Sequence, residues 1–307
     1  MKTEIPVNNR DDDAFRAYAE QVMAQPKNYL LSARFLTHSM EKCVARYNVL
    51  PNRGLGKAAD LITELEDFRE LGLVHTYEYQ EGLAALEAFL AFQEEAGGDV
   101  AELRERAAGL LATAEPGHAG GCFVATRDEL LAGTRFDFPA FAASRHSMRT
   151  YAPDDVTEEE FLDAVRLAEL CPSACNREPW KVYYSLDRDV CRKLADVLPA
   201  QPFLRDAYVG VITIDRGLFA NEEILQWFVN GGIFAAYLVQ ALHYKGIGSC
   251  LCEINVLHKD KPLIRELMGI SDAEEIICFV GFGKYPEEAK CTCAERKPVS
   301  DVAIRVG

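Results

Sequence analysis

Apolar residues recur at three- and four-residue spacing through most of the first 140 residues of the chain. This spacing places them on one face of a helix, so each run predicts an amphipathic helix. Proline and glycine separate the runs, as they do at helix ends. The predicted helices cover residues 12–25, 28–47, 57–73, 77–95 and 100–111. The pattern therefore predicts an all-helical N-terminal region over residues 1–140.

One part of this region mixes a histidine, a carboxylate and several cations. His38 and Glu41 are followed by a basic stretch over residues 46–57. Such a mixture can form a substrate-facing surface, and it also occurs at an ordinary helix end with its solvated turn. The sequence leaves both interpretations open.

From residue 141 onward, helical and strand patterns alternate. Thr157 and Glu160 have the capping-box spacing, which predicts a helix from there to about Leu170. Runs of β-branched and aromatic residues predict strands over 180–185, 207–214 and 276–283, with a helix near 190–198 between the first two. The mixture predicts an α+β domain over residues 141–307.

The longest predicted helix covers residues 221–244, with Asn221 as its N-cap. It is apolar nearly all round, so it must be covered on most sides. Gly231 and Gly232 each lower helix propensity by about 1 kcal/mol relative to alanine, which is sensible where another backbone approaches closely. We therefore expect a second copy of the chain at this helix, and a homodimer.

Composition limits the partners of the protein. The chain has 307 residues, 49% of them hydrophobic, which is ample material for buried cores. Its net charge of −15 repels nucleic acid and anionic membrane surfaces. Residues 1–13 lack the apolar segment of a secretion signal, and no run of 18 consecutive apolar residues occurs. We expect a cytoplasmic protein with no nucleic-acid and no membrane partner.

Ten cysteines are scattered along the chain, and without a secretion signal we interpret them as reduced thiols. The alternative is a metal site made by two Cys-x-Cys units, Cys250 with Cys252 and Cys291 with Cys293. Zinc sites usually have a gap of two to four residues between paired cysteines. We therefore predict packed thiols and no metal.

Two short motifs carry the candidate chemistry. Arg145, Ser147 and Arg149 lie within one short stretch, and on a helix or tight turn the two arginines share a face. That arrangement suits a phosphate, although the same residues also occur at solvated helix ends. The second motif, Pro-Ser-Ala-Cys-Asn-Arg-Glu-Pro-Trp, follows at residues 172–180.

In this order and at this distance, the two motifs resemble the Arg-x-Ser-x-Arg and Pro-Ser-x-x-Asn-x-x-Pro-Trp elements of the nitroreductase-like family of flavoproteins. The turn at 246–249, the Gly-Phe-Gly at 281–283 and Arg296 shortly before Pro298 also resemble family elements. The resemblance covers about residues 141–306. It implies a nitroreductase-like fold, with a central, mainly antiparallel sheet flanked by helices.

The resemblance also implies a cofactor, FMN, and the residues that bind it. Arg145, Ser147 and Arg296 would hold the phosphate with His146 beside them, and Arg149 would reach the phosphate or the polar edge of the ring. A loop formed by Leu251, Cys252, Glu253 and Ile254 would face flavin N5. Pro172, Ser173, Ala174 and Asn176 would reach the flavin of the opposite subunit, so the sites would be shared across the homodimer.

The implied activity is that of an FMN-dependent oxidoreductase. NADH or NADPH would deliver hydride to N5, and an electron-poor small-molecule acceptor, such as a nitroaromatic or a quinone, would then be reduced in the same pocket. The flavin carries this chemistry, so no catalytic side chain is required. The alternatives are a dehalogenase-like or dehydrogenase-like member of the family, or a flavin-binding or degenerate scaffold whose role is set by the helical region.

Two departures from the family pattern bear on these alternatives. Ala294 stands where some relatives have a lysine, which would leave the phosphate with fewer cations. Glu178 stands where a glutamine often precedes Pro-Trp, which puts an amide contact to the flavin ring in doubt.

Overall fold

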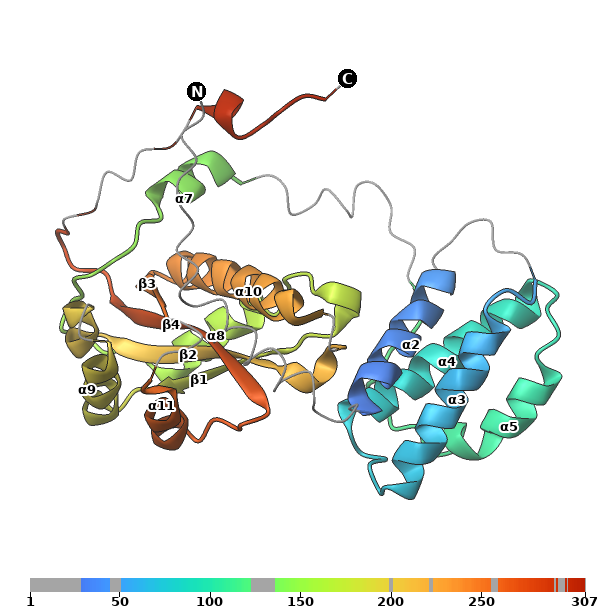
Figure 1. Cartoon of the computed structure of the whole chain (residues 1–307). Coiled ribbons are helices and arrows are strands. Elements are labelled where there is room, and N and C mark those ends of the chain that lie inside the picture. The colour runs from blue at the N-terminus through green and yellow to red at the C-terminus, as the bar shows by residue number, and fades with distance from the viewer. Residues whose placement is uncertain are drawn as a thin grey trace, which may run out of the picture.

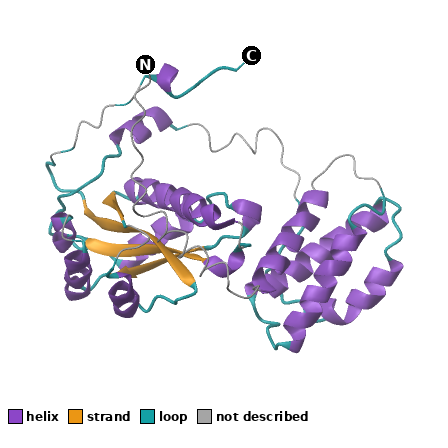
Figure 2. Ribbon diagram, viewed as in Figure 1, coloured by secondary structure: helices purple, strands orange, loops and turns teal. Residues whose placement is uncertain are grey.

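The structure of the protein, a computed structural model, describes residues 29–44, 51–122, 136–198, 201–220, 223–254, 259–289, 291, 296 and 298–306. Figures 1 and 2 show a helical bundle and a separate part in which helices cover a β-sheet. Each part has its own buried hydrophobic cluster. The division of the chain near residue 140 remains a prediction.

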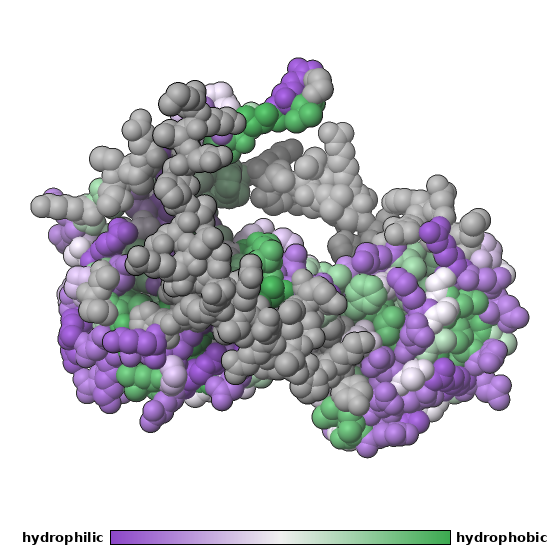
Figure 3. All heavy atoms as spheres, viewed as in Figure 1, coloured by the Kyte–Doolittle hydropathy of each residue, from purple (hydrophilic) through white to green (hydrophobic). Residues whose placement is uncertain are grey.

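The N-terminal part is a bundle of four helices within the described residues: α2 (Tyr29–Val44), α3 (Leu55–Glu70), α4 (Tyr77–Glu95) and α5 (Ala101–Leu111). Thr76 caps α4 by accepting a hydrogen bond from the amide of Tyr79. These four helices confirm the periodicity prediction, whereas the predicted helix over 12–25 lies outside the described residues. Hydrophilic residues cover much of the visible face of the bundle (Figure 3).

The C-terminal part contains a four-stranded sheet in the order β1-β2-β4-β3, with antiparallel pairing throughout. Its strands are β1 (Trp180–Ser185), β2 (Tyr208–Asp215), β3 (Ile247–Glu253) and β4 (Glu274–Lys284). β2 is buried along nearly its whole length, as expected of a central strand covered on both faces. The predicted α+β fold with a mainly antiparallel sheet is confirmed.

Helices cover both faces of this sheet. α10 (Ile224–Tyr244) lies on one side, where it contacts β2, β3 and β4 and packs on α8 (Glu158–Ala168). α9 (Arg188–Val197) and α11 (Lys261–Met268) lie on the other side (Figure 1). The remaining elements are α7 (Phe138–Ser144) and the short 3-10 turns η2 (Ala174–Asn176), η3 (Pro202–Asp206), η4 (Arg216–Leu218) and η6 (Val299–Asp301).

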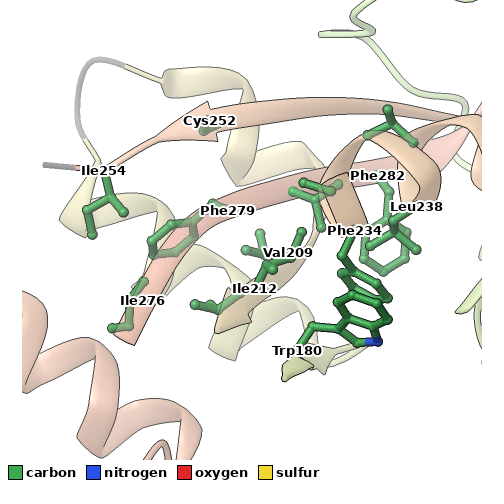
Figure 4. Packing of buried hydrophobic residues seen from close by; sticks show 14 of the residues in the cluster. Trp180, Val209, Ile212, Phe234, Leu238, Cys252, Ile254, Ile276, Phe279 and Phe282 are labelled. Atoms are coloured by element: carbon green, nitrogen blue, oxygen red, sulfur yellow. The ribbon is translucent and has the colours of Figure 1, made fainter. Parts of the chain in front are cut away.

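The core under α10 fixes the start of β1. The ring of Trp180 stacks on Phe234 of α10, with ring centroids 5.1 Å apart and ring planes 15° apart (Figure 4). The capping box of α8 is present as predicted, with Thr157 and Glu160 each bonding the backbone of the other. The stacking of Trp180 on Phe234 therefore holds the first residue of β1 against α10.

The α10 helix differs in one respect from the expectation. A Cβ atom on Gly231 would lie 2.7 Å from the side chain of Ile277, so the close neighbour at Gly231 is β4 of the same chain and not a second subunit. At Gly232 no atom of the described part of the chain lies within 4 Å of the corresponding position. The helix is long and apolar enough to cross a membrane, but it packs on the sheet as a core helix does. The predicted cap, Asn221, lies outside the described residues.

Candidate functional site

The first predicted motif lies along the edge of the sheet at β3. Ser147 forms an isolated parallel bridge with Ser249, and the amide of Met148 donates to the carbonyl of Ser249 at 2.9 Å. α7 ends at Ser144, and Arg145 already has extended backbone angles. A shared helix face for Arg145 and Arg149 is therefore wrong, because the backbone here pairs with β3. Both arginines nonetheless lie near the thiol of Cys250, whose pKa each of them lowers.

The two arginines of this cluster have no carboxylate partner among the described residues. Arg149 donates to the carbonyl of Ser147 at 3.3 Å and lies over the ring of Phe203. Arg145 is half-buried, and His146 beside it is exposed. In a chain with a net charge of −15, two neighbouring cations without an ion pair form a site suited to an anion.

The positive charges of this cluster shift the pKa values of nearby cysteine thiols and of the His243 imidazole. The pKa of the buried Cys250 thiol is lowered to about 6, chiefly by a hydrogen bond with Cys252 and further by Arg149, Ser147 and Arg145. That same hydrogen bond, together with burial, raises the pKa of Cys252. Burial lowers the pKa of His243, and the charge of Arg145 lowers it further. These shifts indicate positive potential at the start of β3.

The residues predicted to form a loop facing N5 lie mostly in a strand. Leu251, Cys252 and Glu253 belong to β3 and pair with Val280, Phe279 and Cys278 of β4, so the expectation of a loop is wrong for them. Ile254 follows the strand and is buried. Residues 255–258 lie outside the described residues.

The strand pairing decides which backbone amides of β3 point to β4 and which point to the outer edge of the sheet. The carbonyl of Ser249 points away from β4, toward Met148. Backbone groups alternate along a strand, so the amides of Leu251 and Glu253 point to this outer edge, and the amide of Cys252 points to β4. The outer edge of β3 therefore combines backbone donors with the two arginines.

The second motif forms a loop over residues 172–180, called the 172–180 loop below. Cys175, Asn176 and Glu178 all have positive φ, at 53°, 51° and 45°. A left-handed conformation costs roughly 1–2 kcal/mol for a residue with a side chain, and such strain persists only where the surroundings enforce it. Pro172 is exposed at the start of the loop.

Hydrogen bonds hold this loop from inside and from α10. The amide of Ala174 donates to Oδ1 of the buried Asn230 at 2.8 Å. The amide of Glu178 donates to the hydroxyl of Ser173 at 3.0 Å, and the amide of Asn176 donates to the carbonyl of Ser173. Ser173 thus accepts both hydrogen bonds that close the turn, one with its hydroxyl and one with its carbonyl.

The two motifs of this site lie within a segment that matches a known family. Residues 142–201, which include the arginine cluster and the 172–180 loop, match the Nitroreductase family. This match, two curated relatives and the solved structure described below together support a nitroreductase-like family for the C-terminal part of the chain. Two curated relatives are both named "Putative NADH dehydrogenase/NAD(P)H nitroreductase". The one from Archaeoglobus fulgidus is 23% identical over 48% of this chain and 84% of its own length. The one from Methanothermobacter thermautotrophicus is 28% identical over 47% and 75%.

A solved structure supports a nitroreductase-like fold for the C-terminal part of the chain. A "putative nitroreductase" from Bacillus subtilis is similar over 55% of this chain and 99% of its own chain, with a TM-score of 0.50 and 18% sequence identity. At that identity the likeness concerns the fold alone.

Two buried arginines at the loop were not predicted from the sequence. Arg177 is 3% exposed, donates to both carboxylate oxygens of Glu223 at 2.9 and 3.3 Å, and lies over the ring of Phe219. Burial raises the pKa of Glu223, but the bonds and charge of Arg177 together with the bond from the amide of Ala220 outweigh burial, and the net shift is downward. The motif match drew attention to its neighbours, and nothing in the local sequence marks Arg177 as buried.

The second is Arg34 of α2, which lies in the helical bundle. Its Nη1 donates to Glu81 at 2.8 Å and to the carbonyl of Asn176 at 3.3 Å, and its Nη2 lies 3.8 Å from Glu178. Its guanidinium also lies over the ring of Tyr77. Burial raises the pKa of Glu81 to about 7 in spite of the attraction of Arg34. Arg34 and Asn176 are 142 residues apart, so no local signal could have joined them.

The remaining predicted residues are less closely tied to the cluster. Arg296 is exposed, and its place at the phosphate stays a prediction. Gly281 and Gly283 lie in β4 and do not form a turn. Cys250 and Cys252 are buried, Cys291 is exposed, and Cys293 lies outside the described residues. In the described part of the chain no group of three or more histidine, cysteine or acidic side chains could hold a metal.

Proposed function

We propose that the protein is an FMN-dependent oxidoreductase that passes electrons from NADH or NADPH to an electron-poor small-molecule acceptor. The observation that carries the proposal is the pair Arg145 and Arg149, which has no carboxylate partner among the described residues and lies at the free edge of β3. The match of residues 142–201 to the Nitroreductase family supports it.

The residues present suit this cofactor. Arg145, Ser147 and Arg149 offer cationic and hydroxyl donors for a phosphate, and the outward amides of Leu251 and Glu253 offer donors for the polar edge of a ring. Bound FMN would supply the two-electron redox chemistry. The chain would bind and orient the cofactor, and the backbone donors would stabilise negative charge on the reduced ring.

We also propose a cytoplasmic homodimer in which the 172–180 loop of one subunit completes the site of the other. α10 exposes Leu225 and Val229 by 68% and 50%, and the C-terminal segment exposes Ile304 and Val306 by 74% and 92%. Figure 3 shows hydrophobic residues along that segment. Apolar surface of this kind is usually covered by a partner.

The experiment is anaerobic mixing of the purified, FMN-treated protein with NADH and with NADPH, followed by a panel of quinones and nitroaromatics. We expect bleaching of the flavin absorbance by a nicotinamide and its return with an acceptor. A colourless protein that takes up no FMN would contradict the proposal and favour the scaffold alternative.

A further inference from the structure

We propose that Arg34 of the helical bundle is a positioning residue for the flavin site, because it holds the 172–180 loop in its left-handed conformation through Asn176 and Glu178. The assignment of this loop to a flavin site rests on the proposed function. The holding of the loop by Arg34 does not, and it can be tested without a cofactor.

The contact joins the two parts of the molecule. The bundle helix α2 contacts both η2, inside the loop, and η4, before α10. At this junction the side chain of Arg34 is only 6% exposed. It is bound on one side by Glu81 of its own bundle and on the other by the backbone of Asn176. One side chain therefore bridges the bundle and the loop.

The loop is held from two sides, and the two sides restrain different residues. Asn230 of α10 binds the amide of Ala174, and Glu223 at the N-cap of α10 binds the side chain of Arg177. From the bundle, Arg34 reaches Asn176 and Glu178, two of the three loop residues with positive φ. Asn176 and Glu178 are therefore restrained by Arg34 and by the turn that Ser173 closes.

The chemistry of the contact requires an arginine. The planar guanidinium has five N–H donors and can meet a carboxylate and a carbonyl at the same time, whereas a lysine ammonium is a point charge. The face of the guanidinium also lies 4.8 Å from the ring centroid of Tyr77, so it is fixed in orientation. The charge of Arg34 therefore lies beside the carboxylate of Glu178, the residue that stands where a glutamine often precedes Pro-Trp in the family pattern.

The test is hydrogen exchange on the full chain without FMN, comparing Arg34→Met with Arg104→Met. Arg104 is a matched control, since it pairs with Glu87 and Glu94 within the bundle, away from the loop. We expect the amides of Asn176 and Glu178 to exchange at least tenfold faster in R34M and at the wild-type rate in R104M. Unchanged exchange in R34M would overturn the proposal.

A conservative variant covers the case in which R34M loosens the bundle, which far-UV circular dichroism would detect. Arg34→Lys keeps the charge and the packed stem but lacks the fork. We expect R34K to keep the helicity of the wild type while the same two amides exchange several-fold faster. Wild-type exchange in R34K would then overturn the proposal.

A second measurement links the loop to the cofactor. Titration with FMN, followed by flavin fluorescence and the visible spectrum, should give about a tenfold higher Kd and a shifted spectrum in R34M, with no change in R104M. Faster exchange with an unchanged FMN Kd would overturn a positioning role in the site. If the wild type takes up no FMN, the proposed function fails, and the exchange experiment alone decides whether Arg34 holds the loop.

Discussion

The arginines of this chain differ in what neutralises them, and the difference separates structural from ligand-binding roles. Arg34 and Arg177 are buried and meet carboxylates of their own chain, so their charge is used within the fold. Arg145 and Arg149 meet no carboxylate among the described residues. A buried charge without a partner raises the free energy of the folded chain, whereas an exposed or half-buried charge is solvated and can bind a ligand.

This contrast predicts the effect of removing either ligand-binding cation. Arg145→Ala and Arg149→Ala should each weaken FMN binding at least tenfold, because a charge-assisted hydrogen bond is worth roughly 1.5–3 kcal/mol. Arg166→Ala is the control, since Arg166 is an exposed arginine of α8 paired with Asp163. Fluorescence titration measures the three affinities. Equal Kd values in the wild type and both cluster variants would refute the assignment.

The buried carboxyl of Glu81 predicts a pH dependence of stability. Burial raises its pKa in the folded chain to about 7, from the 4.5 of an unperturbed glutamate carboxyl. The folded chain therefore holds this proton more tightly, so its contribution to stability is complete below pH 4.5 and is lost as pH rises through 7. Glu81→Gln should match the wild type near pH 4.5 and exceed it at about pH 8.5 by up to about 3 kcal/mol.

Urea unfolding at the two pH values measures this difference, with the exposed Glu102→Gln as the baseline. If E81Q raised the free energy of unfolding equally at both pH values, that result would argue against a raised pKa of Glu81 in the folded chain.

At the scale of elements, α10 organises the domain because its two faces have different surroundings. Trp227, Phe234 and Leu238 are buried against the sheet, while Leu225 and Val229 are exposed. Gly231 belongs to the sheet side, where only a residue without a side chain lets the helix lie against Ile277. The neighbouring Gly232 has open space.

The two glycines therefore predict opposite effects of one methyl group. Gly231→Ala should destabilise the protein by about 1–3 kcal/mol, because overpacking forces the helix away from β4. Gly232→Ala should be neutral or stabilising by up to about 1 kcal/mol, because alanine favours helix and no atom of the described residues is in its way. Thermal unfolding of both variants measures this, and equal effects would contradict the placement of α10 on β4.

At the scale of the whole molecule, the exposed apolar surface predicts association. If the open face of α10 is the dimer surface, Val229→Lys should shift the protein toward monomer in sedimentation and weaken FMN binding, because the site is shared. Leu71→Lys changes an equally exposed apolar residue, 55% exposed, in the helical bundle, and should leave both properties unchanged. A V229K protein that remains a dimer with full FMN content would rule out this face.

The amino-acid sequence alone determined the features whose causes are local. The capping box of Thr157 and Glu160 and the spacing of apolar residues in α4 act over a few residues, so the elements followed from the pattern. The arginine cluster also followed, although its extended backbone did not, because that depends on pairing with Ser249, about a hundred residues away.

Only the tertiary structure decided which distant groups meet. The periodicity that predicts α2 does not reveal that Arg34 reaches Asn176, and the pair of glycines in α10 does not reveal that Gly231 faces Ile277. Pairing with β4 likewise placed Leu251 and Glu253 in a strand edge instead of a loop. Such contacts depend on how whole elements pack, and a local pattern records the face that an element buries but not the partner that covers it.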